Sequence, residues 1–280
     1  MRYAITAATA LLLLVCGALA GTPSYPDWKG QWTRAPVRGA AGQPPHDPSR
    51  PPGRGQEAPL TPEYQEKFER NLADQAAGGP GTSATFVCLP NGMPRIMSAY
   101  EPIEFIVTPE VTWVLVDHIE HTRRIYTDGR PWPEEIEPSW TGYSIGRWLD
   151  EDGDGRYDVL EVESRGFKGP RAYDASGLPL HEDNESVIRE RIFLDTADPG
   201  LMHDEITTLD HALTRPWTVT KNYVRTPDPR PPWHEWICGE NNQHVVIGTD
   251  SYFLSADGLL MPARRDQPPP DLKYFARRQR

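Results

Sequence analysis

The sequence predicts an all-β fold: an antiparallel, lipocalin-like barrel of about eight to ten strands with one N-terminal helix. Between residues 104 and 253, short segments rich in valine, isoleucine, threonine and aromatic residues alternate with turn residues. No helical period spans any of these segments. We prefer a closed barrel because closure removes the strand edges that a long meander would expose. A β-sandwich or a propeller-like fold is the alternative, although no repeat of fixed period supports a propeller.

Ten segments have this strand character. They are residues 104–108, 111–116, 124–126, 143–148, 157–162, 187–194, 205–209, 216–224, 233–238 and 245–248. Their short spacing indicates antiparallel neighbours rather than strands joined by crossover helices.

One helix is predicted, over residues 61–74. Thr61 can serve as its N-cap, and Pro62 fits its first turn. Tyr64, Phe68 and Leu72 recur every four residues and so form one apolar stripe. We expect this helix to lie on the surface of the β domain.

Residues 1–20 are typical of a cleavable secretory signal peptide. Arg2 precedes an apolar run that is too short to span a bilayer, and Ala18 and Ala20 give the A-x-A cleavage pattern. Cys16 suggests a lipoprotein anchor as the alternative, but Val15 stands where a small residue is expected. We therefore predict cleavage after Ala20 and a location in the periplasm or outside the cell.

The rest of the chain is predicted to form an arm and one domain. Residues 21–60 are rich in proline and glycine, which favours an extended arm with Trp28 and Trp32 as docking points. Residues 61–280 are expected to form a single β-barrel domain with a proline-rich C-terminal tail.

The formal net charge of −11 bears on the partners. This charge disfavours nucleic acid and anionic membrane surfaces. No segment after the signal peptide approaches the length of a transmembrane helix. We expect a small-molecule ligand, no nucleic acid and no integral membrane segment in the mature chain, while the sequence leaves the oligomeric state open.

Two cysteines, Cys88 and Cys238, remain after removal of the signal peptide. An even pair in an oxidising compartment predicts a disulfide. Two buried free thiols or a catalytic cysteine are the alternative, but no Cys-x-x-Cys motif marks either residue as reactive.

The segment D-E-D-G-D-G-R-Y-D-V-L-E, residues 150–161, matches the spacing of a calcium loop. The predicted ligands are Asp150, Asp152, Asp154, Asp158 and the backbone carbonyl of Arg156. Gly155 occupies the sharp-turn position of such loops. Because the flanking residues favour strands, we predict a structural Ca²⁺ between two strands; a solvated acidic turn is the alternative.

Glu190 is the first candidate catalytic residue. It shares a strand face with Ile188 and Ile192, and a carboxylate among aliphatic side chains must find a partner or shift its pKa. If residues 117–124 form one strand, Arg124 shares a face with His118 and Glu120 and can supply the partner charge. A structural ion pair is the alternative.

His203 and Glu205 share a face of a later predicted strand and complete the candidate set for acid/base chemistry. The candidate catalytic residues are therefore Glu190, Glu205, His203 and Arg124. A solvent-facing polar row is the alternative explanation for His203 and Glu205.

Aromatic side chains form a second candidate site. Trp132, Trp140, Tyr143 and Trp217 can line the mouth of a barrel and bind an apolar or sugar-like ligand. Core packing is the alternative.

Four motifs follow one another along the chain: R-R-I-Y-T-D-G-R-P-W-P, P-S-W-T-G-Y-S-I-G-R-W, E-V-E-S-R-G-F and T-R-P-W-T-V. Their order resembles that of a large group of exported bacterial proteins of uncharacterised function. The resemblance runs from about Cys88 to Asn241 and includes the late C-G-E-N. Members usually carry a tight G-D-T turn where this chain has the loop of residues 150–158, so a calcium site would be limited to a subset. The resemblance assigns no catalytic residue.

Three functions fit these features. The first is a periplasmic barrel that binds a small apolar or aromatic molecule, with a structural calcium loop. The second is a cofactor-free hydrolase or lyase that uses an interior Glu/His/Arg cluster. The third is a structural or interaction module. Charged groups that converge inside the barrel would favour the enzyme, an apolar cavity would favour the binder, and a filled barrel would favour the module.

Overall fold

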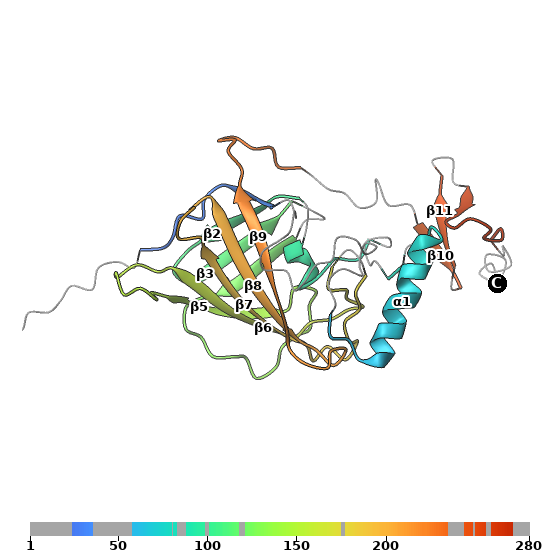
Figure 1. Cartoon of the computed structure of the whole chain (residues 1–280), viewed down its shortest axis with the longest axis horizontal. Helices are drawn as coiled ribbons and strands as arrows, with labels where there is room; N and C mark the ends of the chain where they lie inside the picture. Colours follow the sequence, from blue (N-terminus) through green and yellow to red (C-terminus); the bar gives the residue numbers. More distant parts are fainter. Residues whose placement is uncertain are drawn as a thin grey trace, which may run out of the picture.

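The chain folds into a closed barrel of nine strands, with an α-helix at one end of the barrel and a three-stranded sheet near the C-terminus (Figure 1). The structure is a computed structural model that describes residues 24–35, 58–79, 81–82, 88–98, 101–117, 121–174, 177–234, 244–248, 250–255 and 259–270. Within these ranges, α1 (Pro62–Ala76) is the single α-helix. The predicted all-β barrel with one helix is confirmed.

The barrel strands are β1 (Gln31–Arg34), β2 (Ile103–Val107), β3 (Val111–Val116), β4 (His121–Tyr126), β5 (Tyr143–Leu149), β6 (Val159–Arg165), β7 (Val187–Leu194), β8 (Leu201–Leu209) and β9 (Trp217–Arg225). β3 and β7 have the predicted bounds. Side chains alternate between the interior and the outer face: β7 buries Ile188, Glu190 and Ile192 and turns Arg189 and Arg191 outward.

Neighbouring barrel strands pair antiparallel except β4 and β5, which pair in parallel with Ile125 opposite Ser144. An odd number of strands that closes in chain order needs at least one parallel pair, because the directions of the strands cannot alternate all the way round. Residues 127–142 make the long connection that a parallel pair requires.

β1 closes the barrel by pairing with both β2 and β9. Trp28 and Trp32 are buried, and the indole Nε1 of Trp32 donates to the backbone oxygen of Trp28 at 2.9 Å. The two tryptophans are docking points as predicted, but the sequence-based domain boundary at residue 60 placed this strand in the extended arm. The strand is only four residues long, which is too short for a reliable strand pattern.

α1 packs against one end of the barrel (Figure 1), where Phe68 belongs to one hydrophobic cluster with Tyr173, Leu178 and Trp217. Its start is as predicted: the Thr61 hydroxyl accepts the backbone N–H of Tyr64 at 3.4 Å. A 3₁₀ helix, η2 (Arg95–Ser98), contributes Ile96 and Met97 to the barrel core. Loop side chains therefore help to fill this end of the lumen.

β10 (His244–Ile247), β11 (Asp250–Leu254) and β12 (Leu260–Pro262) form a separate sheet beyond α1 (Figure 1). The predicted strand at 245–248 is thus a strand, but it does not join the barrel. The predicted strand at 233–238 is wrong at its start, because Trp233 and His234 lie outside any strand. Residues 235–238 lie outside the described residues.

Two predictions fall on residues that the structure does not describe. The signal peptide at residues 1–20 is one. The other is the disulfide, because Cys88 lies in a described turn but Cys238 does not. Mass spectrometry of the unreduced protein tests this pairing. In the described ranges, no helix is both long enough and apolar enough to cross a membrane.

Candidate functional site

The barrel interior holds a group of buried polar side chains, which we call the lumen cluster. Its members are Arg123 on β4, Ser144 on β5, Ser164 on β6, Glu190 on β7, Asp204 on β8 and Lys221 on β9. None of them is more than 2% exposed. Buried charges are expensive unless they are paired and hydrogen-bonded, so the partners of each member decide what the cluster does.

Arg123 and Glu190 form a bidentate ion pair inside the barrel. Nη1 of Arg123 donates to Oε1 of Glu190 at 2.8 Å, and Nη2 donates to Oε2. The guanidinium also donates to Oγ of Ser164 at 2.9 Å and to Oγ of Ser144 at 3.4 Å. This pair is satisfied within the protein, and it holds one wall of the lumen in a fixed arrangement.

Small residues on β5 and β6 leave room for the Arg123 side chain to reach β7. Ser144 and Ser164 are opposite each other, with their hydroxyl oxygens 2.7 Å apart. Next along β5, a Cβ on Gly146 would lie 2.7 Å from Cγ2 of Ile125, so this wall has no room for a larger side chain.

Asp204 and Lys221 are cross-strand partners on β8 and β9, but they do not hydrogen-bond to each other. In the described part of the chain, neither carboxylate oxygen of Asp204 nor Nζ of Lys221 has a hydrogen-bond partner. Burial lowers the pKa of Lys221 to about 8. Burial, together with the nearby Glu190 charge, raises the pKa of the Asp204 carboxyl well above its usual value.

Two hydroxyls in the same part of the barrel are also without a hydrogen-bond partner among the described residues, those of Tyr173 and Thr208. Nζ of Lys221 lies 5.4 Å from the centre of the Tyr173 ring, and the Trp217 ring packs against that ring at a tilt of 43°, with ring centres 4.5 Å apart. The end of the lumen nearest α1 thus combines unused donors and acceptors with two aromatic rings.

Unpaired polar atoms at this depth are unusual, because about 90% or more of buried polar groups are hydrogen-bonded. Each unpaired group costs about 1–3 kcal/mol. Such atoms also occur elsewhere among the described residues, but those of Asp204 and Lys221 belong to oppositely charged groups on facing strands, and they mark a place where a small polar molecule would find hydrogen bonds that the protein does not supply. The ammonium offers a donor, and the carboxyl offers an acceptor or, when protonated, a donor.

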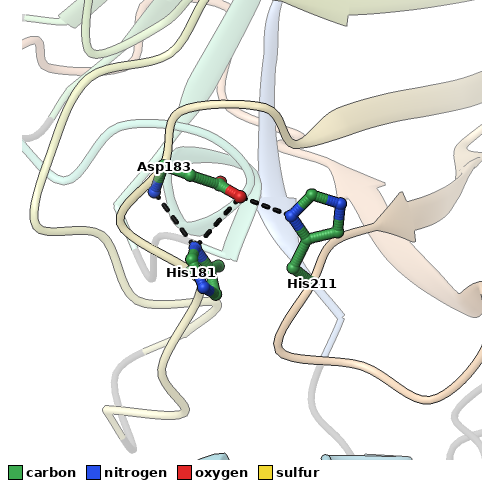
Figure 2. Close-up of side chains that lie close together, drawn as sticks. All are labelled: His181, Asp183 and His211. Atoms are coloured by element: carbon green, nitrogen blue, oxygen red, sulfur yellow. Dashed lines mark hydrogen bonds and ion pairs between the residues drawn. The ribbon is translucent and has the colours of Figure 1, made fainter.

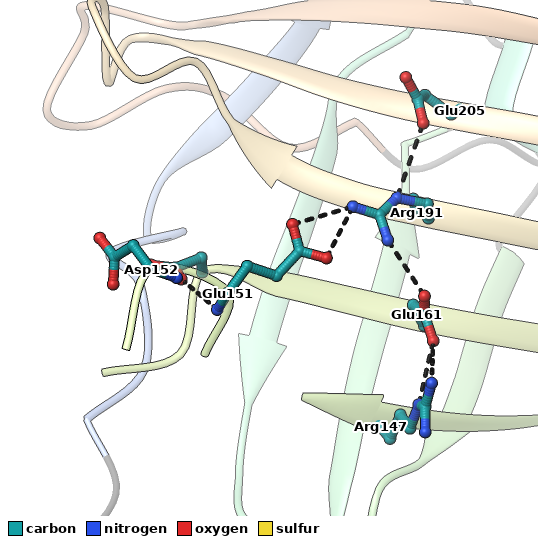
Figure 3. A network of polar contacts seen from close by, with 7 residues as sticks. Arg147, Glu151, Asp152, Glu161, Arg191 and Glu205 are labelled. Carbon is teal, nitrogen blue, oxygen red and sulfur yellow. Dashed lines mark hydrogen bonds and ion pairs between the residues drawn. The ribbon is translucent and has the colours of Figure 1, made fainter. Parts of the chain in front are cut away.

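The predicted catalytic set does not come together. Glu190 faces the lumen as expected, but Glu205 lies on the outer face of the barrel, where Nε of Arg191 approaches it at 3.7 Å (Figure 3). His203 also lies outside, and its ring nitrogens contact Asn222 at 2.8 Å and Asp195 at 3.2 Å. The prediction that Glu205 and His203 act with Glu190 in one interior site is therefore wrong.

The prediction that Arg124 supplies the partner charge for Glu190 is wrong for a different reason. Residues 117–124 are not one strand, because β3 ends at Val116, a turn begins at Asp117 and β4 begins only at His121. This turn changes the alternation, so Arg123 points inward and Arg124 points outward, with its guanidinium carbon 4.6 Å from the Trp113 ring centre.

The outer face carries a ladder of ion pairs that runs across β5, β6 and β7 (Figure 3). Arg147 contacts Glu161 at 2.8 Å, and Glu161 contacts Arg191 at 3.0 Å. Arg191 also contacts Glu151 at 2.9 Å, in the loop of residues 150–158, which we call the aspartate loop. A hollow of about 500 Å³ lies over this ladder, but its arginines and glutamates are engaged with one another. The charged groups of the outer face are therefore already paired, whereas Asp204 and Lys221 have no hydrogen-bond partner among the described residues.

The aromatic residues predicted to bind a ligand are split between two places. Trp217 is buried at the α1 end of the lumen. Trp132 and Tyr143 lie together outside the barrel near the parallel pair of β4 and β5, with ring centres 6.0 Å apart. The ring centre of Trp140 lies 5.9 Å from Nζ of Lys168. They do not form one cage, because alternation turns Tyr143 outward on β5.

The aspartate loop brings three of its four predicted carboxylates together. Asp150, Asp152 and Asp158 each place an oxygen within 4.8 Å of the others. Asp150 accepts the backbone N–H groups of Gly153 at 2.8 Å and Gly155 at 2.9 Å, which fixes the turn.

The remaining predicted ligands of the loop are Asp154 and the backbone carbonyl of Arg156. Asp154 accepts the backbone N–H of Arg156 at 2.8 Å and is not part of the three-carboxylate group. Carboxylate oxygens at this spacing are suited to Ca²⁺.

Sequence reasoning missed Arg123, Asp204 and Lys221. Asp204 lies between the inward-facing Met202 and Ile206. This is the pattern of an acid among apolar residues that identified Glu190. Lys221 lies in the same way between Val219 and Tyr223 on β9. The same pattern therefore contained the signal for both residues.

Comparisons of the sequence with models of protein families and with curated proteins give no match.

Proposed function

We propose that this protein binds a small polar molecule inside its barrel, at Asp204 and Lys221. The observation that carries the proposal is a pair of buried cross-strand groups that have no hydrogen-bond partner among the described residues. A ligand would supply those partners. A purely structural core would be more stable with apolar side chains at these positions.

The ligand class follows from the two groups. Lys221 favours an acceptor or an anionic group, and Asp204 favours a donor or a cationic group, so a small amphoteric molecule fits both. The rings of Tyr173 and Trp217 add apolar contact beside them. Architecture alone suggested an apolar or aromatic ligand, whereas the charged groups in the lumen favour a polar one.

A thermal-shift screen of the full chain tests this proposal. The probes are amino acids, hydroxy acids and amino sugars, and a ligand that binds only the folded protein raises Tm. Asp204→Asn and Lys221→Met should remove the shift, and Glu205→Gln, on the outer face, should keep it. If no compound shifts Tm, or if the shift persists in both lumen variants, the proposal is wrong.

A second candidate function is acid/base catalysis by the same two groups. Lys221 with a pKa of about 8, beside a carboxyl whose pKa is raised, is the kind of pair that exchanges protons near neutral pH. A hydrolase or lyase would therefore use these residues rather than His203 and Glu205. Chemical change of a bound compound by the wild type, but not by Lys221→Met, would favour catalysis, and unchanged recovery of the compound would favour binding.

We also propose that the loop at residues 150–158 binds a structural Ca²⁺. The close approach of Asp150, Asp152 and Asp158 supports this ion. Calcium should raise Tm in protein freed of metal, and Asp152→Ala should abolish the increase. Glu151→Ala removes a neighbouring carboxylate outside the ligand pattern and should keep it. An unchanged melting curve with calcium and with chelator would contradict the site.

The third proposal is export to the periplasm or beyond, which rests on the sequence of residues 1–20. The intact mass of the protein recovered from its native cells should correspond to cleavage after Ala20. A mass that includes residues 1–20 would contradict export by this route.

A further inference from the structure

A cluster of two histidines and one aspartate lies outside the barrel, away from the lumen cluster. His181 and Asp183 belong to the segment before β7, and His211 belongs to the turn between β8 and β9 (Figure 2). Each of the three places one ligand atom within 4.8 Å of the others. Two segments that are distant in the sequence therefore present metal-ligating atoms to one point.

The carboxylate of Asp183 lies between the two imidazoles (Figure 2). Its Oδ2 is 3.1 Å from Nδ1 of His181 and forms a hydrogen bond with Nδ1 of His211. Its Oδ1 accepts the backbone N–H of Glu185 at 3.1 Å, which holds the carboxylate in this orientation. The backbone N–H of Asp183 donates to Nδ1 of His181 at 3.1 Å, so in this arrangement Nδ1 carries the lone pair and not the proton.

Asp210 fixes the two segments relative to each other. Its Oδ1 accepts the backbone N–H of His181 at 2.9 Å and that of Ala212 at 2.8 Å, one on each segment. Its Oδ2 accepts the hydroxyl of Ser186, which in turn accepts Nη2 of Arg171 at 2.6 Å. The residues that present the ligands are therefore preorganised by contacts that do not use the ligand atoms.

The ring of His181 is further held by Tyr64 of α1, with ring centres 5.4 Å apart. On the other side, the His181 and His211 rings meet edge to face at 5.6 Å. His211 is 62% exposed, so solvent reaches the ligand atoms. The cluster thus has a supported inner side and an open outer side.

The donor set selects the class of metal. Imidazole nitrogen and carboxylate oxygen suit Zn²⁺ and its transition-metal neighbours, whereas Ca²⁺ and Mg²⁺ prefer oxygen alone. Tetrahedral ligands at about 2.1 Å from Zn²⁺ lie about 3.4 Å apart, which small side-chain rotations of these three residues would reach. Three protein ligands and an open side leave room for a water molecule.

We infer that His181, Asp183 and His211 form a binding site for a divalent transition-metal ion, with Zn²⁺ strongly preferred over Ca²⁺. The ion joins the segment before β7 to the β8–β9 turn beside α1. The site is separate from the aspartate loop, which offers only oxygen ligands.

Calorimetric titration of the full mature chain, without a histidine tag and freed of metal, tests the inference with Zn²⁺ as the probe. We expect one equivalent of Zn²⁺ to bind at this site. His181→Ala and His211→Ala should each weaken the affinity at least tenfold, because each removes one of three ligands. His203→Ala removes an outer-face histidine with carboxylate and amide contacts, and Asp152→Ala removes a calcium-loop ligand; both should leave Zn²⁺ binding unchanged.

Spectroscopy with Cu²⁺ gives an independent measurement. Electron paramagnetic resonance should show two coordinated nitrogens in the wild type and one in each histidine variant. Where an alanine variant fails to fold by circular dichroism, Asp183→Asn replaces it and should weaken binding while keeping both nitrogens. Absence of a Zn²⁺ site, or an affinity in the folded His181→Ala and His211→Ala proteins equal to that of the wild type, would overturn the inference.

Discussion

The two faces of strands β5 to β9 both carry charged side chains, but in different surroundings. On the outer face, Arg147 and Glu161 are 73% and 31% exposed and bond to each other at 2.8 Å (Figure 3). On the inner face, Asp204 and Lys221 are 0% and 1% exposed and lack hydrogen-bond partners among the described residues. The outer face holds exposed pairs, and the inner face holds one buried pair, Arg123 and Glu190, together with two buried groups in need of partners.

This difference shows which charges carry information about function. Exposed ion pairs contribute about 0–1 kcal/mol and are common on any soluble surface. A buried ionisable group without a partner lowers stability, so a chain that keeps one is expected to use it. Substitutions on the inner face should therefore change stability strongly, in either direction, and those on the outer face should change it little.

The largest effect is expected for Arg123→Met, which leaves Glu190 buried without its partner. Removing one member of a buried ion pair costs about 3–5 kcal/mol. Arg147→Met, the matched change in an exposed pair, should alter the free energy of unfolding by no more than about 1 kcal/mol. Urea denaturation of both variants measures the difference, and equal losses would remove the distinction between the two faces.

Lys221→Met should raise the free energy of unfolding, whereas Arg123→Met lowers it. The pKa of Lys221 is lowered to about 8, below its value in the unfolded chain. The unfolded state therefore binds more protons between about pH 8 and 10, and wild-type stability falls as the pH decreases through this range. The variant lacks this loss, so the difference between its free energy of unfolding and that of the wild type should grow by about 2 kcal/mol from pH 10 to pH 8. A constant difference between the two proteins would contradict the buried state of the ammonium.

Asp204→Asn should raise the free energy of unfolding by less than Lys221→Met does. This increase should grow as the pH rises, whereas that of Lys221→Met grows as the pH falls. The pKa of Asp204 is raised in the folded state by burial and by Glu190. Its contribution to stability is therefore complete at pH values below about 4 and is lost as the pH rises through the folded pKa. At pH 7 the variant should be more stable than the wild type by about 1–2 kcal/mol, and at pH 3 the difference should vanish. Thermal unfolding at the two pH values measures it, and a destabilised variant at pH 7 would indicate that the carboxylate has a partner.

Glu205→Gln is expected to have the smallest effect. Glu205 is 41% exposed, and Arg191, its neighbour at 3.7 Å, also contacts Glu151 and Glu161. Loss of one partner should change the free energy of unfolding by no more than about 0.5 kcal/mol. A larger loss by urea denaturation would show that the outer ladder is cooperative.

Local pattern was enough to predict much of the fold. The strands β3 and β7 and the Thr61 cap follow from β-branched residues, alternation and capping chemistry, all of which act over a few neighbouring residues. β1 was missed because its four residues contribute to the barrel only through pairing with β2 and β9, which lie far away in the sequence. The separate position of β10 is likewise a tertiary property.

The prediction of the candidate site depended on which side chains of each strand face the barrel interior. Glu190 was placed correctly because its strand is long and regular. The turn that begins at Asp117, after β3, was not recognised in the sequence. The prediction therefore named Arg124 instead of Arg123, since a shift of one residue moves a side chain to the other face of a strand. The cross-strand opposition of Asp204 and Lys221 depends on register, which the pattern of a single strand does not contain.

The most direct test of the buried, unpartnered lumen site is the titration of Lys221 by nuclear magnetic resonance. The chain has five lysines, so the ¹³Cε signals of a lysine-labelled protein are few, and Lys221→Met assigns the one that matters. The lumen site predicts that this signal titrates with a midpoint near pH 8, whereas the hydrogen bond to Glu63 raises the pKa of the exposed Lys67 above its ordinary value. A Lys221 midpoint near 10.5 would show an ammonium that is solvated or ion-paired, and it would contradict the proposed site.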